Sequence, residues 1–246
     1  MKTPPPPAPV RDVVARGGVG GFRPDELQAV ARYAWRLLAL KSPAAGDALV
    51  ALLRELAARS MAREPASKGL ACARGCAACC TQHVSVHAVE VFALARALRG
   101  RPPAGLTGAA ERRVGQACPL LGADRACTIH PIRPFACRMF VSVDARACDR
   151  AFAAGGAPGT WPQPFVDTNA WAIMALWAAQ RALALPVGGY ALAPALAAAI
   201  ADPGLEAAWY AGADPLARFA GPADAPQPAM LAAVDALVRD ARLGVH

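Results

Sequence analysis

The chain has 246 residues and a mass of 25.3 kDa, which is enough for one large domain or two small ones with a buried core. Apolar residues make up 55% of it, aromatic residues 6% and charged residues 18%. This composition excludes a charge-rich disordered chain and favours an alanine-rich helical protein over a β-sandwich. The net charge of +8 is unevenly spread: residues 1–150 hold 22 basic and 11 acidic side chains, whereas residues 151–246 hold 4 and 7.

Residues 1–21 contain a run of four prolines and a cluster of four glycines, and we expect a flexible tail there. Apolar residues at helical spacing then predict a helix that begins at Pro24 and a second helix over 45–63. These two helices form a predicted N-terminal helical region over 22–66. A third amphipathic helix is predicted over 84–98, directly after the first cysteines.

The second half of the chain begins with a stretch, from Cys118 to Cys148, in which the sequence predicts turns, short elements and a short strand at 140–143. Helical periodicity then predicts a C-terminal helical region over 151–246, packed on a cysteine-cluster domain over 67–150. No internal repeat and no strand–helix alternation is apparent in the sequence. We therefore expect a mainly α fold, in which helices pack around a cysteine-rich, loop-dominated metal-binding centre. The helices predicted in the C-terminal region cover 167–185, 191–201, 205–219 and 229–242.

All eight cysteines lie between Cys72 and Cys148. The first ten residues contain a proline run where a secretory signal needs an apolar stretch, and the uncharged stretch 182–201 is interrupted by prolines and glycines. We therefore expect no membrane span and a cytoplasmic location, where thiols stay reduced. Clustered reduced thiols indicate metal binding rather than disulfides. Burial as small apolar side chains would explain one or two of them, most easily Cys72 or Cys148.

The cysteines form two sets in the sequence: CARGCAACC contains the first four, and the second four are spaced about ten residues apart. A thiolate ligand must reach a point about 2.3 Å from the metal, so short, sharply turning segments of small residues suit it. Four thiolates are the number that tetrahedral zinc or a cysteine-ligated iron–sulfur cluster takes. Adjacent side chains point in different directions, so Cys79 and Cys80 are not expected to share one simple site, and ligands of the two sets can interleave. The predicted metal ligands are Cys72, Cys76, Cys79, Cys80, Cys118, Cys127, Cys137 and Cys148.

The segments CARGCAACC, CPLL and CTIHPIRPFACR resemble the YkgJ-type cysteine-cluster family, which is described as zinc- or iron-chelating. The resemblance covers residues 72–148. His130 stands where the family commonly has a tyrosine, and Cys148 resembles a further cysteine of some members. The resemblance implies a zinc or iron cofactor, with an iron–sulfur cluster as one form of the iron. The positions that match the family pattern are Cys72, Cys76, Cys79, Cys80, Cys118, Cys127, Arg133, Pro134, Cys137 and Arg138.

Two arginines, Arg133 and Arg138, are predicted to lie beside the metal-bound thiolates, where guanidinium groups lower thiol pKa values and offset negative charge. The alternative is that Arg133 and Pro134 set a turn and that both arginines are solvated. The excess basic charge lacks interleaved aromatic residues and a helix-turn-helix signature, so we expect no nucleic-acid partner. His83 and His87, four residues apart, and Glu90 would share a helix face and could complete a metal site, or could be surface and capping residues.

Three functions are compatible with these motifs. The first is a cytoplasmic protein that chelates zinc or iron through clustered cysteines. The second is an iron–sulfur enzyme such as an S-adenosylmethionine-dependent protein lysine methylase, because the spacing of Cys72, Cys76 and Cys79 resembles the cluster motif of radical S-adenosylmethionine enzymes, and flagellin lysine-N-methylases contain a similar cluster. The third is an interaction module in which zinc holds a docking surface for a protein partner.

Overall fold

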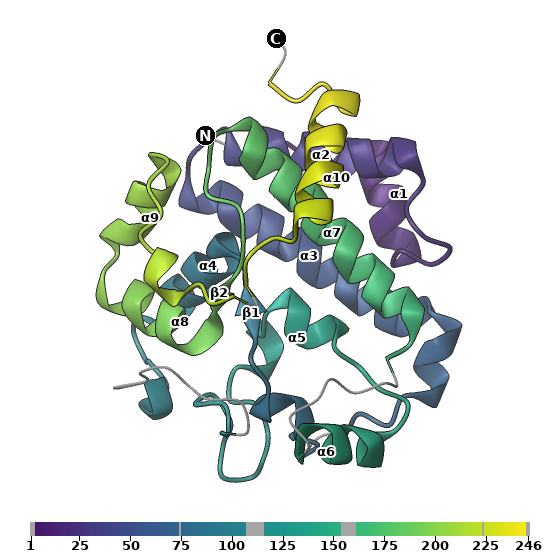
Figure 1. Cartoon of the computed structure of the whole chain (residues 1–246), viewed down its shortest axis with the longest axis vertical. Coiled ribbons are helices and arrows are strands. Elements are labelled where there is room, and N and C mark those ends of the chain that lie inside the picture. Colours follow the sequence, from purple (N-terminus) through teal and green to yellow (C-terminus); the bar gives the residue numbers. More distant parts are fainter. Residues whose placement is uncertain (1–2, 74, 107–115, 154–160, 223, 245–246) are drawn as a thin grey trace.

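The computed structural model describes residues 3–73, 75–106, 116–153, 161–222 and 224–244 (Figure 1). In these ranges the fold is mainly helical, as the sequence predicts. Helices from both ends of the chain lie together in the upper part of Figure 1, and the teal cysteine-bearing segment lies below them. None of the helices in the described ranges is both long enough and apolar enough to cross a membrane. The helices are α1 (Ala8–Arg16), α2 (Pro24–Leu38), α3 (Pro43–Arg63), α4 (Ala88–Leu98), α5 (Phe135–Met139), α6 (Ala145–Ala153), α7 (Gln163–Ala182), α8 (Leu192–Ala201), α9 (Gly204–Tyr210) and α10 (Pro228–Asp240).

Short elements join these helices. Strands β1 (Ser85–Val86) and β2 (Tyr190–Ala191) pair antiparallel, with Ser85 opposite Ala191 and Val86 opposite Tyr190. This pairing connects the segment after the first cysteines to the segment before α8. Five 3₁₀ turns complete the described elements: η1 (Pro65–Gly69), η2 (Ala78–Thr81), η3 (Ala104–Leu106), η4 (His130–Ile132) and η5 (Ala217–Phe219).

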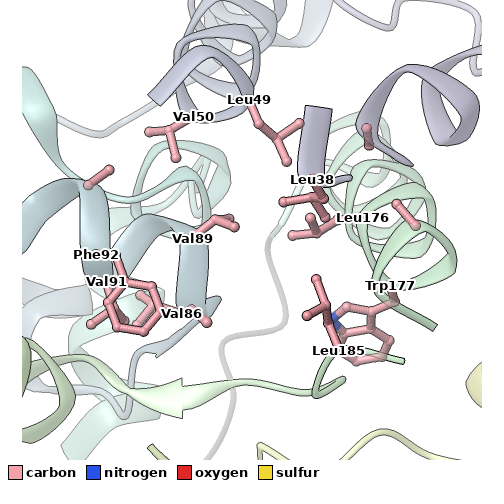
Figure 2. Close-up of a cluster of buried hydrophobic side chains, with 14 of the residues drawn as sticks. Leu38, Leu49, Val50, Val86, Val89, Val91, Phe92, Leu176, Trp177 and Leu185 are labelled. Carbon is pink, nitrogen blue, oxygen red and sulfur yellow. The ribbon is translucent and has the colours of Figure 1, made fainter. Parts of the chain in front are cut away.

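The main core lies where α2, α3, α4, α7 and α8 meet, and it includes buried residues from Val10 to Leu243. Figure 2 shows Leu38 of α2, Leu49 of α3, Val89 of α4 and Leu176 of α7 in this core. Each is at most 2% exposed. Burying such a side chain contributes about 1.5–3 kcal/mol to stability. The N-terminal, middle and C-terminal parts of the chain therefore share one core.

The N-terminal segment differs from the predicted flexible tail. Residues 8–16 form α1, whose Val10 and Val13 are fully buried, and the hydroxyl of Tyr33 donates a hydrogen bond to the Pro4 carbonyl at 3.0 Å. The tail prediction is wrong here because apolar residues at helical spacing follow the prolines and find a surface on α3. The turn after α1 requires glycine: Gly17 has a φ of +68°, and a Cβ there would lie 2.3 Å from the carbonyl carbon of Arg59.

The other predicted elements are confirmed to different degrees. The helices predicted from Pro24 and over 45–63 correspond to α2 and α3, and α8 and α10 lie close to their predicted ranges. The helix predicted over 84–98 begins only at Ala88, because 85–86 form β1. The strand predicted at 140–143 is wrong: these residues have no regular secondary structure between α5 and α6. The helix predicted over 205–219 is divided into α9 and η5, with a turn between them, and the sequence analysis did not predict α5 or α6.

Candidate metal centre

The eight cysteines are all free thiols. They lie on loops, on the short turn η2 and on the short helices α5 and α6. By their packing, their electrostatic interactions and the cavity that they line, we assign them to a first thiol group (Cys72, Cys76, Cys79 and Cys148) and a neighbouring second thiol group (Cys80, Cys118, Cys127 and Cys137).

The first thiol group lies where α6 packs on η2. Cys148 and Ala78 are buried together, and Cys76 and Cys79 pack against them. The thiol of Cys72 accepts a hydrogen bond from the backbone N–H of Ser142 at 3.4 Å. Burial raises the pKa of the Cys72 thiol, and repulsion from the charged forms of Cys76 and Cys148 raises it further. Cys148 therefore lies with cysteines that are about 70 residues earlier in the chain.

The second thiol group lines one wall of a cavity. The backbone N–H of Cys118 donates to the carbonyl of Cys80 at 2.7 Å, which joins the loop that begins at Cys118 to the end of η2. Burial raises the pKa of Cys137, and the nearby thiols of Cys118 and Cys127 add to this effect. Burial likewise raises the pKa of Cys127, with a further contribution from Cys80.

Cys79, of the first thiol group, also interacts with the second group. Its pKa is raised first by a hydrogen bond with Cys80, then by burial, and then by the charged forms of Cys80, Cys137 and Cys72. The two sequence sets do interleave: Cys80 lies with the later cysteines and Cys148 with the earlier ones. As they stand, no three Cys, His, Asp or Glu side chains in the described ranges converge closely enough to hold a metal ion. The donor chemistry nevertheless fits zinc or iron, because thiolates are the ligands that these ions take in cysteine-rich sites.

The two predicted arginines lie beside the thiols, and neither is fully exposed. Arg133 lines the cavity, and its charge lowers the pKa values of Cys72, Cys127 and Cys137, against the larger effect of burial. Its Nε is buried and has no hydrogen-bond partner.

Arg138 instead holds the backbone of the same loop. Its guanidinium donates to the carbonyls of Pro131 at 2.5 Å and Arg133 at 3.0 Å. Burial lowers the pKa of Arg138, and the positive charges of Arg133 and Arg54 lower it further. Arg138 therefore positions the loop that carries Arg133.

The histidines near the first cysteines do not share a helix face, because His83 lies before β1 and His87 directly before α4. His87 is buried, and its Nδ1 lies 3.3 Å from the indole Nε1 of Trp177, which can only donate. Burial lowers the pKa of His87. Glu90 accepts a hydrogen bond from the backbone N–H of Phe135 at 2.6 Å. His87 therefore connects α4 to α7, and Glu90 holds the start of α5, the helix that carries Cys137.

His83 has a partner that the sequence analysis missed. Its Nε2 lies 2.7 Å from the carboxylate of Asp224, which is buried and also accepts the backbone N–H of Gly221 at 2.8 Å. The two residues are 141 positions apart, and no sequence signal links them. His130 is exposed and is not among the residues that line the cavity.

The cavity beside the second thiol group has a volume of about 490 Å³. Cys79 and the four cysteines of the second group form one side of it. The cavity is also lined by α7, through Asn169, Ile173 and Trp177, and by the segment that leads into α10. The cysteine spacing predicted the thiols, but no sequence pattern marked the lining residues of α7, which carries an ordinary apolar helical pattern.

One comparison with known proteins bears on this centre. Residues 71–154 match a family model described as "CxxCxxCC: Putative zinc- or iron-chelating domain". The match covers about a third of the chain and contains all eight cysteines. This match confirms the predicted resemblance to the YkgJ-type cysteine-cluster family over residues 71–154. No curated protein and no solved structure gives a significant match.

Proposed function

We propose that this chain binds zinc or iron ions through its two thiol groups, and that the bound metal holds the cysteine-bearing segment in its folded form. The observation that carries the proposal is the gathering of eight free thiols, from five separate short elements and loops, into two neighbouring groups of four. A reducing compartment such as the cytoplasm suits these thiols, because oxidation to disulfides would remove the ligands.

Charge balance supports the proposal. Four thiolates around one divalent ion carry a net charge of about −2, so two loaded groups would place about −4 in the middle of the chain. Arg133 and Arg138 lie within this region, and the first 150 residues carry 22 basic side chains against 11 acidic ones. This excess of positive charge stabilises the thiolate forms that a metal requires.

Metal binding must move the thiols closer together than they stand here. None of the described residues in the loop that carries Cys72 and Cys76 belongs to the main core, so this loop can adjust with little cost to that core. Gly75, at a φ of +86°, turns the chain between Cys72 and Cys79, and a Cβ there would meet no atom within 4 Å. Metal-binding energy of the order of 10–16 kcal/mol, as measured for small structural zinc sites, would easily offset the ordering of these loops.

The chemistry differs with the metal that is bound. Zinc would supply a purely structural link between the loops, whereas an iron–sulfur cluster would add the capacity to transfer electrons. No observation in the described ranges favours the methylase alternative, so we do not extend the proposal to it. A docking surface for a protein partner would need zinc bound at the same thiols, so the metal analysis below also tests that alternative.

The test is the metal content of the full chain, purified without oxygen and measured by inductively coupled plasma mass spectrometry. We expect about two zinc ions per chain, or iron with matching acid-labile sulfide and a brown colour. Cys148→Ser removes a ligand from the first thiol group, and Cys127→Ser removes one from the second. Each variant should lose about half of the metal, and the double variant should lose nearly all of it.

Val143→Ser serves as the matched control, because Val143 is 47% exposed on the same loop as Ser142 and has no thiol. It should keep the full metal content. A wild-type chain without metal would contradict the proposed function. Complete loss of metal in either single variant would show one shared cluster and contradict the division into two groups.

A further inference from the structure

The cavity beside the second thiol group is larger than a metal ion and its thiolate ligands require. Its volume of about 490 Å³ lies within the range of small-molecule binding sites. Five thiols line one side, and the opposite side is remote from every cysteine in sequence. A group bound there would contact both the metal centre and the helical frame.

The wall opposite the thiols is mostly apolar. Ile173, Trp177 and Leu192 line it, together with Met230 of α10. Asn169 is the exception: it lines the cavity from α7, and its side-chain oxygen is buried with no hydrogen-bond partner. A buried polar atom without a partner costs about 1–3 kcal/mol. A ligand with an N–H or O–H group placed against Asn169 would remove this cost.

The charges around the cavity disfavour an anionic ligand, and its apolar lining disfavours a charged one of either sign. The metal-loaded thiol groups would carry about −2 each. Among the described residues that line the cavity, Arg133 is the one arginine or lysine. It lies beside the thiols that would carry this negative charge. Asp224 is paired with His83 on the opposite side. An anionic ligand would be repelled by the thiolate-rich wall, and a strongly polar one would lose hydration against the apolar wall.

We propose that this cavity binds an uncharged, largely apolar organic molecule whose N–H or O–H group donates a hydrogen bond to Asn169. The bound molecule would lie between α7 and the second thiol group, in contact with the metal centre. The preference for an uncharged ligand rests on the proposed metal binding, whereas the location of the site rests on the cavity itself.

The experiment uses two fluorescent probes that share one skeleton. N-phenyl-1-naphthylamine is uncharged, aromatic and apolar, and it has a single N–H donor. 8-Anilino-1-naphthalenesulfonate adds one negative charge to the same rings. With the metal-loaded full chain, titration followed by fluorescence should show one binding site for the uncharged probe. The sulfonate should bind at least about tenfold more weakly, which corresponds to about 1.4 kcal/mol of repulsion.

Two substitutions of alanine by phenylalanine locate the site. Ala170→Phe adds a ring to the wall on α7 and should abolish binding of the uncharged probe. Ala229→Phe adds the same ring at an exposed position of α10, outside the lining residues, and should leave binding unchanged. If circular dichroism shows that the Ala170→Phe chain does not fold, Ala225→Phe tests the cavity from its exposed loop side.

Asn169→Leu tests the hydrogen bond. This substitution should weaken the binding of N-phenyl-1-naphthylamine about three- to tenfold. Binding of the N-methylated probe, which has no donor, should stay the same or become tighter.

Unchanged binding of the uncharged probe in the cavity variants would overturn the proposed site, and tighter binding of the sulfonate would overturn the proposed ligand class. Metal content is measured on the same samples. Normal metal without probe binding refutes this inference alone, whereas probe binding without metal refutes the proposed function alone.

Discussion

The helical frame and the cysteine-bearing segment are stabilised in different ways. In the frame, α2, α4, α7 and α8 bury a continuous apolar core, in which Leu37, Leu94 and Leu196 are at most 1% exposed. In the segment from 116 to 130, the buried apolar residues are Leu120 and Ile129. Its backbone hydrogen bonds are mainly local turns, such as that from the N–H of Leu121 to the carbonyl of Cys118 at 2.9 Å.

This difference separates a rigid helical frame from the segments that carry the thiols. The frame holds the cysteine-bearing segment at a few fixed points: Leu120 and Ile129 reach the main core, and Phe135 and Met139 of α5 enter a second core cluster. Between these points the thiols are gathered but do not converge. The frame therefore brings the thiols into one region, and the proposed metal would complete their arrangement.

Removal of the metal should give the largest effect, and it should destabilise the thiol-bearing segments much more than the helical frame. We expect that a strong chelator, applied under reducing conditions, exposes the backbone amides of the thiol-bearing residues 71–81 and 116–148 to hydrogen exchange, because metal-binding free energy of the order of 10 kcal/mol is lost there. Amides in the middle of α2 and α7 should keep most of their protection, because their core does not depend on the metal. Hydrogen exchange followed by mass spectrometry measures both. Equal loss of protection in both regions would show that the frame itself needs the metal.

A cavity in the core of the frame should lower the stability of the fold and leave the metal content unchanged. Leu37→Ala removes a fully buried side chain from α2 and should lower the free energy of unfolding by about 2.7–5 kcal/mol. Metal content should not change, because α2 carries no ligand. Denaturant unfolding and metal analysis of the same preparation test this prediction. Val143→Ala, on the exposed loop, should change stability by less than about 0.5 kcal/mol. Loss of metal in the Leu37→Ala chain would contradict independent stabilisation of the two regions.

The sequence predicted what local patterns determine. Apolar residues at intervals of three and four gave α2 and α3, because those helices bury one face in the core. The spacing of the cysteines indicated two sets of ligands and their interleaving. Residues 140–143 were wrongly predicted as a strand because apolar residues there pack against the first thiol group and the second core cluster rather than pairing with another strand.

What the sequence could not show depends on contacts between distant segments. The pairing of His83 with Asp224 and the cavity residues Asn169 and Trp177 depend on contacts of the middle of the chain with α7 and with the segment before α10. The division of the thiols depends on the packing of α6 on η2. The helix α1 was missed for a different reason. The prolines and glycines around it resemble a linker, and its contacts with α2 and α3 make the intervening valines a buried face.

The contact of α1 with α3 can be tested at two glycines. Gly17→Ala forces a side chain into a left-handed conformation and places its Cβ 2.3 Å from the Arg59 backbone, so we expect a loss of about 2–4 kcal/mol. Gly20 has a similar φ of +76°, but a Cβ there would meet no atom within 4 Å. Gly20→Ala should therefore lower the free energy of unfolding by only about 1–2 kcal/mol. Denaturant unfolding measures both. Equal effects would indicate that α1 does not pack on α3 in solution.

The smallest effect concerns His87, which lies where the frame meets the cysteine-bearing segment. Burial lowers its folded-state pKa below the usual value of about 6.5, although the nearby carboxylate of Glu90 opposes this shift. Below pH 6.5 the unfolded chain therefore binds a proton that the folded chain does not. The folded state loses up to about 1.4 kcal/mol per pH unit until the folded-state pKa is reached, and above pH 6.5 this contribution stays constant.

His87→Gln keeps an acceptor for the indole N–H of Trp177 and removes the titrating group, so it should flatten the fall in unfolding free energy between pH 7 and pH 5. His130→Gln, at an exposed position, should leave that slope as it is in the wild type. Urea unfolding at several pH values, on chains with equal metal content, compares the three slopes. The same slope in His87→Gln and the wild type would mean that His87 is not held neutral by burial. The acid sensitivity of the molecule would then come from the thiol ligands, which must be deprotonated to hold a metal.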